Sequence, residues 1–114
     1  PSPKKMLGSC LGGCVRFPGE SLECIAIGEG IETCLSYWQE HPGMTVWAAL
    51  TAGGLERVIL PPLSVTPEVI ILVDRDKTGI TAAKTLAKGL TGDHRKVFSI
   101  APPRLGTDMN DLKV

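Results

Sequence analysis

The chain has 114 residues, 43% of them hydrophobic and 21% charged, and its formal net charge at pH 7 is zero. This length fits one domain with a single core, and with only 4% aromatic residues that core must be aliphatic. A free-standing nucleic-acid-binding protein usually carries a basic surplus, so the balanced charge counts against that class. No apolar run reaches the ~18 residues of a membrane span, and no signal peptide is visible.

Residues 1–21 form a lead-in rich in Gly, Pro and Lys. Within it, residues 6–8 and 14–17 flank Gly12-Gly13, a pattern that predicts a short hairpin. The chain opens on Pro1 without an initiator Met, which indicates a piece of a larger protein. We expect the domain proper to occupy residues 22–114.

Apolar runs alternate with helical patterns through that domain. Residues 24–28 predict a buried strand. The helix that follows should bury Ile31, Cys34, Leu35 and Trp38, which fall at helical spacing.

A second strand is predicted over residues 44–50, followed by a loop over residues 51–54 and a short helix or turn over residues 55–60. Residues 69–73 carry the strongest strand pattern of the chain. That strand runs directly into Asp74-Arg75-Asp76.

The last predicted elements are an amphipathic helix over residues 78–90 and a strand over residues 96–101. The helix has an apolar face and a basic face. Its apolar face consists of Ile80, Ala83, Ala87 and Leu90, and Lys84 and Lys88 share the other face.

Alternating strands and helices, with strands that are apolar throughout, predict an α/β fold. We expect a Rossmann-like, mainly parallel sheet of about four strands with helices on both faces. Right-handed crossovers place the carboxyl end of every parallel strand at one edge of the sheet. Ligands bind at that edge in open α/β sheets.

The four cysteines lie at positions 10, 14, 24 and 34, without the paired spacing or the following His of a zinc site. Buried or partly buried free thiols are the usual state of such residues. Free thiols favour a reducing, cytoplasmic location.

Acidic residues follow the first, third and fourth predicted strands. Glu29 ends the first strand, Asp74 and Asp76 end the third, and a polar turn over residues 106–111 brings Asp108 and Asp111 after the fourth. Clustered carboxylates resist deprotonation unless a cation is present. Carboxylates without Cys or His favour Mg²⁺, which keeps waters and substrate phosphates as further ligands, with Mn²⁺ as a substitute.

Each acid also has a purely structural explanation. Glu29 could favour the dipole at a helix start, Asp76 could cap the next helix, and Asp108 could form an Asx turn. The basic residues near the strand ends, Arg75, Lys77 and Lys84, could contact phosphates or simply be solvated. Gly30 and the pair Gly53-Gly54 could let a phosphate approach the backbone, although a flexible turn is the favoured explanation of the pair.

At these positions the sequence resembles the Toprim family, which includes primases, topoisomerases and OLD-family nucleases. The family pattern is a Glu-Gly pair after the first strand and Asp-x-Asp after a later one. Glu29-Gly30 and Asp74-Arg75-Asp76 match it. Residues 29–33 and 106–111 are most similar to the Toprim domains of primases and primase–helicases from bacteria, phages and mobile elements.

The resemblance implies roles for five acids. Asp74 and Asp76 would bind Mg²⁺, and Glu29 would bind metal or act as general base on the attacking hydroxyl. Asp108 and Asp111 would assist a second ion. Many bacterial primases carry an acid four residues after the Glu, and here that position is Thr33, which departs from the two-metal pattern.

The function implied is DNA primase-type nucleotidyl transfer, which makes RNA primers on a single-stranded DNA template from nucleoside triphosphates. Other domains of the larger protein, such as a zinc-binding or helicase domain, would assist it, and the isolated domain need not be active. A Toprim-type nuclease is the alternative. Topoisomerase chemistry needs a Tyr nucleophile, and the chain has only Tyr37, in the first predicted helix.

Three other classes stay open. Asp76-Lys77-Thr78-Gly79 resembles the phosphorylated motif of P-type ATPases, and Asp74-x-Asp76-x-Thr78 that of haloacid dehalogenase-type phosphatases. Their motif normally ends the first core strand, whereas here it ends the third. A receiver domain would need an acid pair after the first strand. The third class is a Toprim-fold module that only binds nucleic acid or partners.

Overall fold

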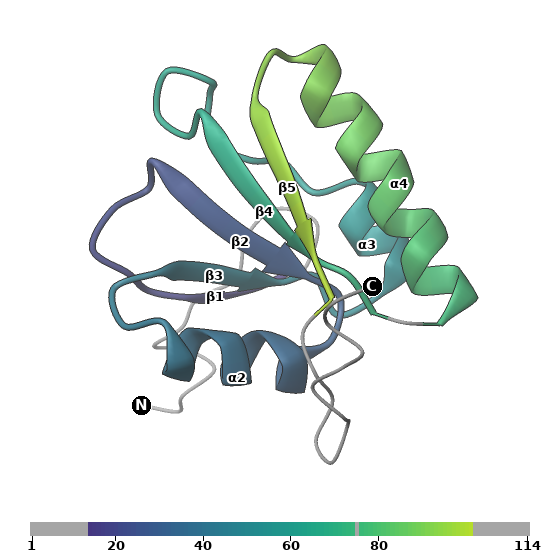
Figure 1. Cartoon of the computed structure of the whole chain (residues 1–114), viewed down its shortest axis with the longest axis horizontal. Coiled ribbons are helices and arrows are strands. Elements are labelled where there is room, and N and C mark those ends of the chain that lie inside the picture. Colours follow the sequence, from purple (N-terminus) through teal and green to yellow (C-terminus); the bar gives the residue numbers. More distant parts are fainter. Residues whose placement is uncertain (1–13, 75, 102–114) are drawn as a thin grey trace.

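The computed structural model describes residues 14–74 and 76–101, which form a five-stranded sheet in the order β1-β3-β2-β4-β5 (Figure 1). The strands are β1 (Val15–Phe17), β2 (Cys24–Gly28), β3 (Thr45–Ala48), β4 (Glu68–Leu72) and β5 (Lys96–Ile100). The helices are α2 (Ile31–Glu40), α3 (Ala52–Glu56) and α4 (Lys77–Gly92). Strands β2 to β5 are mutually parallel, which confirms the predicted α/β class.

The fifth strand comes from the lead-in segment. Strand β1 pairs antiparallel with β3, with Arg16 opposite Trp47, and the Arg16 guanidinium lies 5.7 Å from the centre of the Trp47 ring. The sheet therefore gains a strand beyond the expected four. The other arm of the predicted hairpin, residues 6–8, lies outside the described residues.

Helices cover both faces of the sheet, as predicted (Figure 1). Because side chains alternate along a strand, Ile25 and Ile27 pack with α3 and α4 on one face, while Ala26 packs with α2 on the other. The neighbouring strand follows the same alternation, with Ile71 on the α4 side and Leu72 on the α2 side.

The buried face of α2 differs from the predicted one. Cys34 is buried as expected, but Ile31 and Leu35 are exposed and Tyr37 is buried in their place. The helix packs through Cys34 and Tyr37 against β2 and β3, with Trp38 partly buried beside them, so the prediction was wrong only for Ile31 and Leu35.

Helices α3 and α4 also correct the sequence-based expectations. Helix α3 begins within the predicted loop, because the Thr51 hydroxyl accepts a hydrogen bond from the Gly54 N–H and caps its first turn. In α4 the side chain of Ile80 is exposed, whereas Ala82 and Leu86 are buried.

The cysteines do not all have the expected state. Cys24 and Cys34 are free thiols, but Cys14 is disulfide-bonded, so the prediction of free thiols was wrong for that residue. Within the described residues, no helix has the length and apolarity needed to span a membrane.

Candidate metal centre

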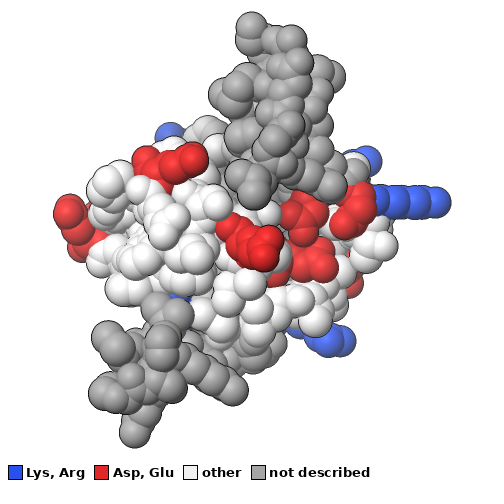
Figure 2. All heavy atoms as spheres, turned by 90° about the horizontal axis from the view of Figure 1, so that it is seen from below, with Lys and Arg blue, Asp and Glu red and all other residues white. Residues whose placement is uncertain are grey.

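The acidic residues lie beyond the ends of two neighbouring parallel strands. Gly28 of β2 pairs with Leu72 of β4, so Glu29 follows one strand end and Asp74 lies two residues beyond the other. Figure 2 views the molecule from below, the side toward which these strands run in Figure 1, and shows carboxylates gathered near its centre with basic side chains toward the periphery.

The carboxyl group of Glu29 is electrostatically perturbed. Burial raises the pKa of its carboxyl group above the ordinary value, and the negative charges of Asp74 and Asp76 raise it further. Its Oε1 atom is buried and has no hydrogen-bond partner among the residues that the structure describes. Burying a carboxylate oxygen without a partner is energetically costly. A cation or a hydrogen-bond donor at this atom would therefore be stabilising.

Asp74 lies between the first turns of two helices. A Cβ atom on Gly30, just before α2, would lie 3.8 Å from Oδ2 of Asp74, which is ordinary contact. A Cβ atom on Gly79, in the first turn of α4, would lie only 2.8 Å from Cβ of Asp74 and 3.0 Å from Oδ1 of Asp76. The absence of a side chain at Gly79 therefore lets α4 approach the two acids.

Asp76 caps a helix, which was one of the two roles that the sequence allowed for it. It is the N-cap residue of α4, where its Oδ1 atom accepts a hydrogen bond from the Gly79 N–H. Its side chain is exposed. The cap fixes the orientation of the carboxylate and so holds its charge close enough to Glu29 to affect the pKa of that residue.

These residues supply part of what a hard divalent cation requires. The buried Oε1 atom of Glu29 and the charges of Asp74 and Asp76 offer oxygen ligands and negative potential. Among residues 14–74 and 76–101, no group of three or more His, Cys, Asp or Glu side chains is arranged to hold a metal ion, so these acids do not form a complete ligand set. An open set of carboxylates suits Mg²⁺, because Mg²⁺ retains waters and binds substrate phosphates.

The structure describes only some of the remaining predicted site residues. Lys77 and Lys84 lie exposed on α4. Arg75, Asp108 and Asp111 lie outside the described residues.

The thiol of Cys34 is not a competing metal ligand. Cys34 is fully buried beneath Gly28, and its Sγ atom hydrogen-bonds to the Trp47 carbonyl at 3.4 Å. Burial and the charge of Asp74 raise its pKa to about 12, against an opposing effect of the Gly28 backbone. The thiol therefore stays protonated at neutral pH.

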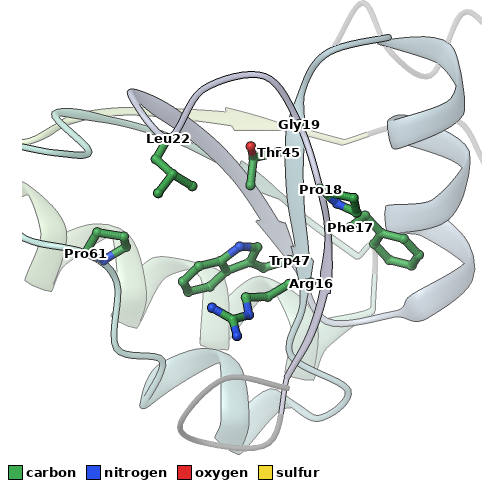
Figure 3. Close-up of a pocket in the computed structure, with 8 residues that line it drawn as sticks. All are labelled: Arg16, Phe17, Pro18, Gly19, Leu22, Thr45, Trp47 and Pro61. Carbon is green, nitrogen blue, oxygen red and sulfur yellow. The ribbon is translucent and has the colours of Figure 1, made fainter. Parts of the chain in front are cut away.

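A pocket of about 350 Å³ lies elsewhere in the molecule (Figure 3). It is lined by Arg16, Phe17, Pro18, Gly19, Leu22, Thr45, Trp47 and Pro61. Thr45 is the first residue of β3 and Leu22 precedes β2, so the pocket lies toward the amino ends of these strands. The acids lie at the opposite end.

The importance of two residues of this region was not predicted from the sequence. Gly79 was assigned to a helix and to a motif similar to that of P-type ATPases, although a Gly in a first turn directly after Asp-x-Asp is a usable sign of close approach. Leu50 has a backbone φ angle of 76°, and no sequence pattern indicates that conformation for a Leu residue.

Replacing Gly79 by Ala should lower the free energy of unfolding by about 1–2 kcal/mol. The added methyl group would overlap Asp74 and Asp76, at a cost of about 1–3 kcal/mol, and the better helix propensity of Ala recovers at most about 1 kcal/mol. Urea denaturation measures the difference.

Gly89 is the matched control, because it lies on the same helix and a Cβ atom there would have nothing within 4 Å. Gly89→Ala should raise stability by about 1 kcal/mol. Equal effects of the two substitutions would contradict the close approach of α4 to the acids.

The sequence matches the model of a known protein family. The family model described as "Toprim domain" matches residues 24–114, which is most of the chain. No curated protein and no solved structure matches the sequence.

Proposed function

This chain belongs to the Toprim domain family, and we propose that it performs Mg²⁺-dependent nucleotidyl transfer as the Toprim domain of a DNA primase. Toprim domains are typical of enzymes that act on nucleic acids with a divalent metal. Primer synthesis on single-stranded DNA is the specific activity proposed for this chain.

The observation that carries the proposal is the state of Glu29. Its carboxyl group has a buried oxygen without a partner in the described part of the chain, and its pKa is raised by burial and by Asp74 and Asp76. A raised pKa is typical of a group that exchanges a proton or binds a cation. This state of Glu29, directly after β2, supports a role in a catalytic centre, and no side chain caps α2.

We assign the roles as follows. Asp74 and Asp76 hold Mg²⁺, and Glu29 either completes that ligand set or accepts the proton of the attacking hydroxyl group. Bound Mg²⁺ would stabilise the charge that develops on the attacking and leaving oxygens of a phosphoryl transfer. Asp108 and Asp111 assist a second ion. The backbone at Gly30 and the side chains of Arg75, Lys77 and Lys84 contact phosphate groups.

One feature of the sequence favours a primase over a nuclease, namely the resemblance of residues 29–33 and 106–111 to primase Toprim domains. The zero net charge supports a larger protein in which other domains bind the template. We propose that this unit spans residues 22–114 and works beside a zinc-binding or helicase domain in the cytoplasm. Cleavage of DNA without primer synthesis would support the nuclease alternative.

The metal site is tested by calorimetric titration of the chain with MgCl₂. Asp74→Asn and Asp76→Asn should each weaken binding about tenfold or more, because unit charges ~4 Å apart at an effective dielectric of 20 interact by several kcal/mol. Asn retains the capping ability of Asp at a helix N-terminus, so the change at Asp76 removes charge and keeps the cap.

Asp93 is the matched control for these substitutions. It is exposed at the other end of α4, where its backbone N–H makes the capping hydrogen bonds, so Asp93→Asn should bind Mg²⁺ as the wild type does. Equal affinity in all four proteins would eliminate the metal site.

A further inference from the structure

Leu50 has a backbone conformation that leucine rarely adopts. Its φ angle is 76°, in the left-handed region where the Cβ atom crowds the backbone and where Gly or Asn is preferred. His94 is the other described non-Gly residue with positive φ, and it lies just beyond the C-cap of α4, where left-handed residues are common. Leu50 instead lies between a strand and a helix.

The turn that contains Leu50 is fixed at both ends. Its N–H donates to the Glu29 carbonyl at 2.8 Å, and the N–H of Ala49 donates to the Gly28 carbonyl at 2.8 Å. On the other side, Thr51 caps α3, and a Cβ atom on Gly54 would lie 2.8 Å from the Ala49 carbonyl oxygen. The conformation of Leu50 is therefore set by its surroundings and tied to the backbone of Glu29.

The side chain of Leu50 is not part of the hydrophobic core. It is 45% exposed, so the chain accepts an unfavourable backbone conformation and an exposed apolar group at the same residue. Strained, solvent-facing residues gather at sites that bind ligands.

A second exposed aliphatic residue follows Glu29 in the chain. Ile31, the first residue of α2, is also 45% exposed, although its helical spacing predicted burial. The Leu50 N–H donates a hydrogen bond to the backbone carbonyl of Glu29, and Ile31 lies two residues after Glu29. Exposed apolar residues therefore occur on two segments whose backbones lie near that of Glu29.

From this placement we propose that Leu50, with Ile31, forms an apolar contact for the sugar and base of an unpaired nucleotide whose phosphate lies at the acidic residues. The inference rests on the proposed function and specifies its substrate class. An unpaired nucleotide exposes base and sugar faces, whereas a duplex presents mainly phosphates outward and keeps its base faces stacked. Leu50 is thus a positioning residue that favours single-stranded over duplex nucleic acid.

The test is a methyl NMR titration of the chain with a short oligo-dT in the presence of MgCl₂, and in parallel with a duplex of the same length. We expect the Leu50 methyl signals to shift with oligo-dT. Leu50→Ala should weaken oligo-dT binding roughly five- to tenfold, the range for losing a few buried methyl groups. Leu50→Met should restore it, and duplex binding should change little.

Leu63 is the matched control. It is 40% exposed and lies in the segment that leads into β4, at the far end of that strand from Asp74, so Leu63→Ala should leave oligo-dT binding unchanged. Equal behaviour of Leu50→Ala and Leu63→Ala, or absence of any Leu50 shift, would overturn the proposal. Mg²⁺ affinity, measured separately, distinguishes this failure from failure of the metal site, because Leu50→Ala should leave it unchanged.

Discussion

Glu29→Gln should reduce primer synthesis by the full-length protein about 10²–10⁴-fold, the usual contribution of a positioned proton acceptor. Gln preserves the shape of the side chain but neither accepts a proton nor carries the charge that attracts Mg²⁺. The measurement is incorporation of labelled ribonucleotides on single-stranded DNA at saturating MgCl₂. At saturation, a loss caused only by weaker metal binding disappears, so a persistent loss identifies Glu29 as part of the chemistry.

Glu32 provides the control for this substitution. It is exposed in the first turn of α2, so Glu32→Gln changes the same charge close to the site. We expect Glu32→Gln to retain wild-type activity. If Glu29→Gln also retained it, the assignment of the catalytic centre would fail.

Glu29→Gln should lower activity but should not lower the stability of the metal-free chain. Without metal, the negative charge of Glu29 is desolvated and repelled by Asp74 and Asp76, and Gln removes both penalties. The metal-free Glu29→Gln chain should therefore be at least as stable as the wild type at pH 7. Clustered negative charges at a binding site lower the stability of the ligand-free fold, and the bound ligand offsets that loss.

The sheet could be predicted from the sequence because its signals are local. Short apolar runs such as residues 24–28 and 69–73 became β2 and β4, and the acids that follow them were placed after strand ends correctly. The parallel arrangement then brings both ends to one edge by geometry alone. Neither step requires knowledge of side-chain contacts.

The faces of the helices could not be predicted in the same way. Both Ile31 and Ile80 are aliphatic and fall at helical spacing, yet both are exposed, and both lie in the first turn of a helix that begins beside the acids. Periodicity assigns such residues to the core because it takes no account of the sheet edge. Of the residues that the structure describes, none forms a strand beyond that edge that would cover these first turns.

The pKa of Glu29 and the conformation of Leu50 depend on contacts distant in sequence. The pKa is raised by residues more than forty positions away, and the left-handed turn is held by backbone hydrogen bonds to the end of β2. A sequence pattern records neither. Only Gly79 left a local sign, since it follows the acidic motif by three residues at a point where a side chain would collide with Asp74.

The raised pKa of Glu29 should also make the metal-free chain less stable as pH increases. Its folded-state pKa lies above the ordinary value of 4.5, through burial first and then through Asp74 and Asp76. Between these two values the folded chain binds more protons than the unfolded chain, so the free energy of unfolding falls as pH rises. Urea denaturation in EDTA, from pH 4.5 upward, measures this contribution as the difference between wild type and Glu29→Gln.

Mg²⁺ affinity should show the opposite trend, because the ion competes with the proton on Glu29. Below the folded-state pKa, affinity should fall about tenfold for each unit decrease in pH, the slope for displacing one proton. Calorimetric titrations at several pH values give this slope, which Glu32→Gln should retain and Glu29→Gln should lose. A Glu29→Gln chain with the wild-type slope would place the competing proton on another group and remove Glu29 from the ligand set.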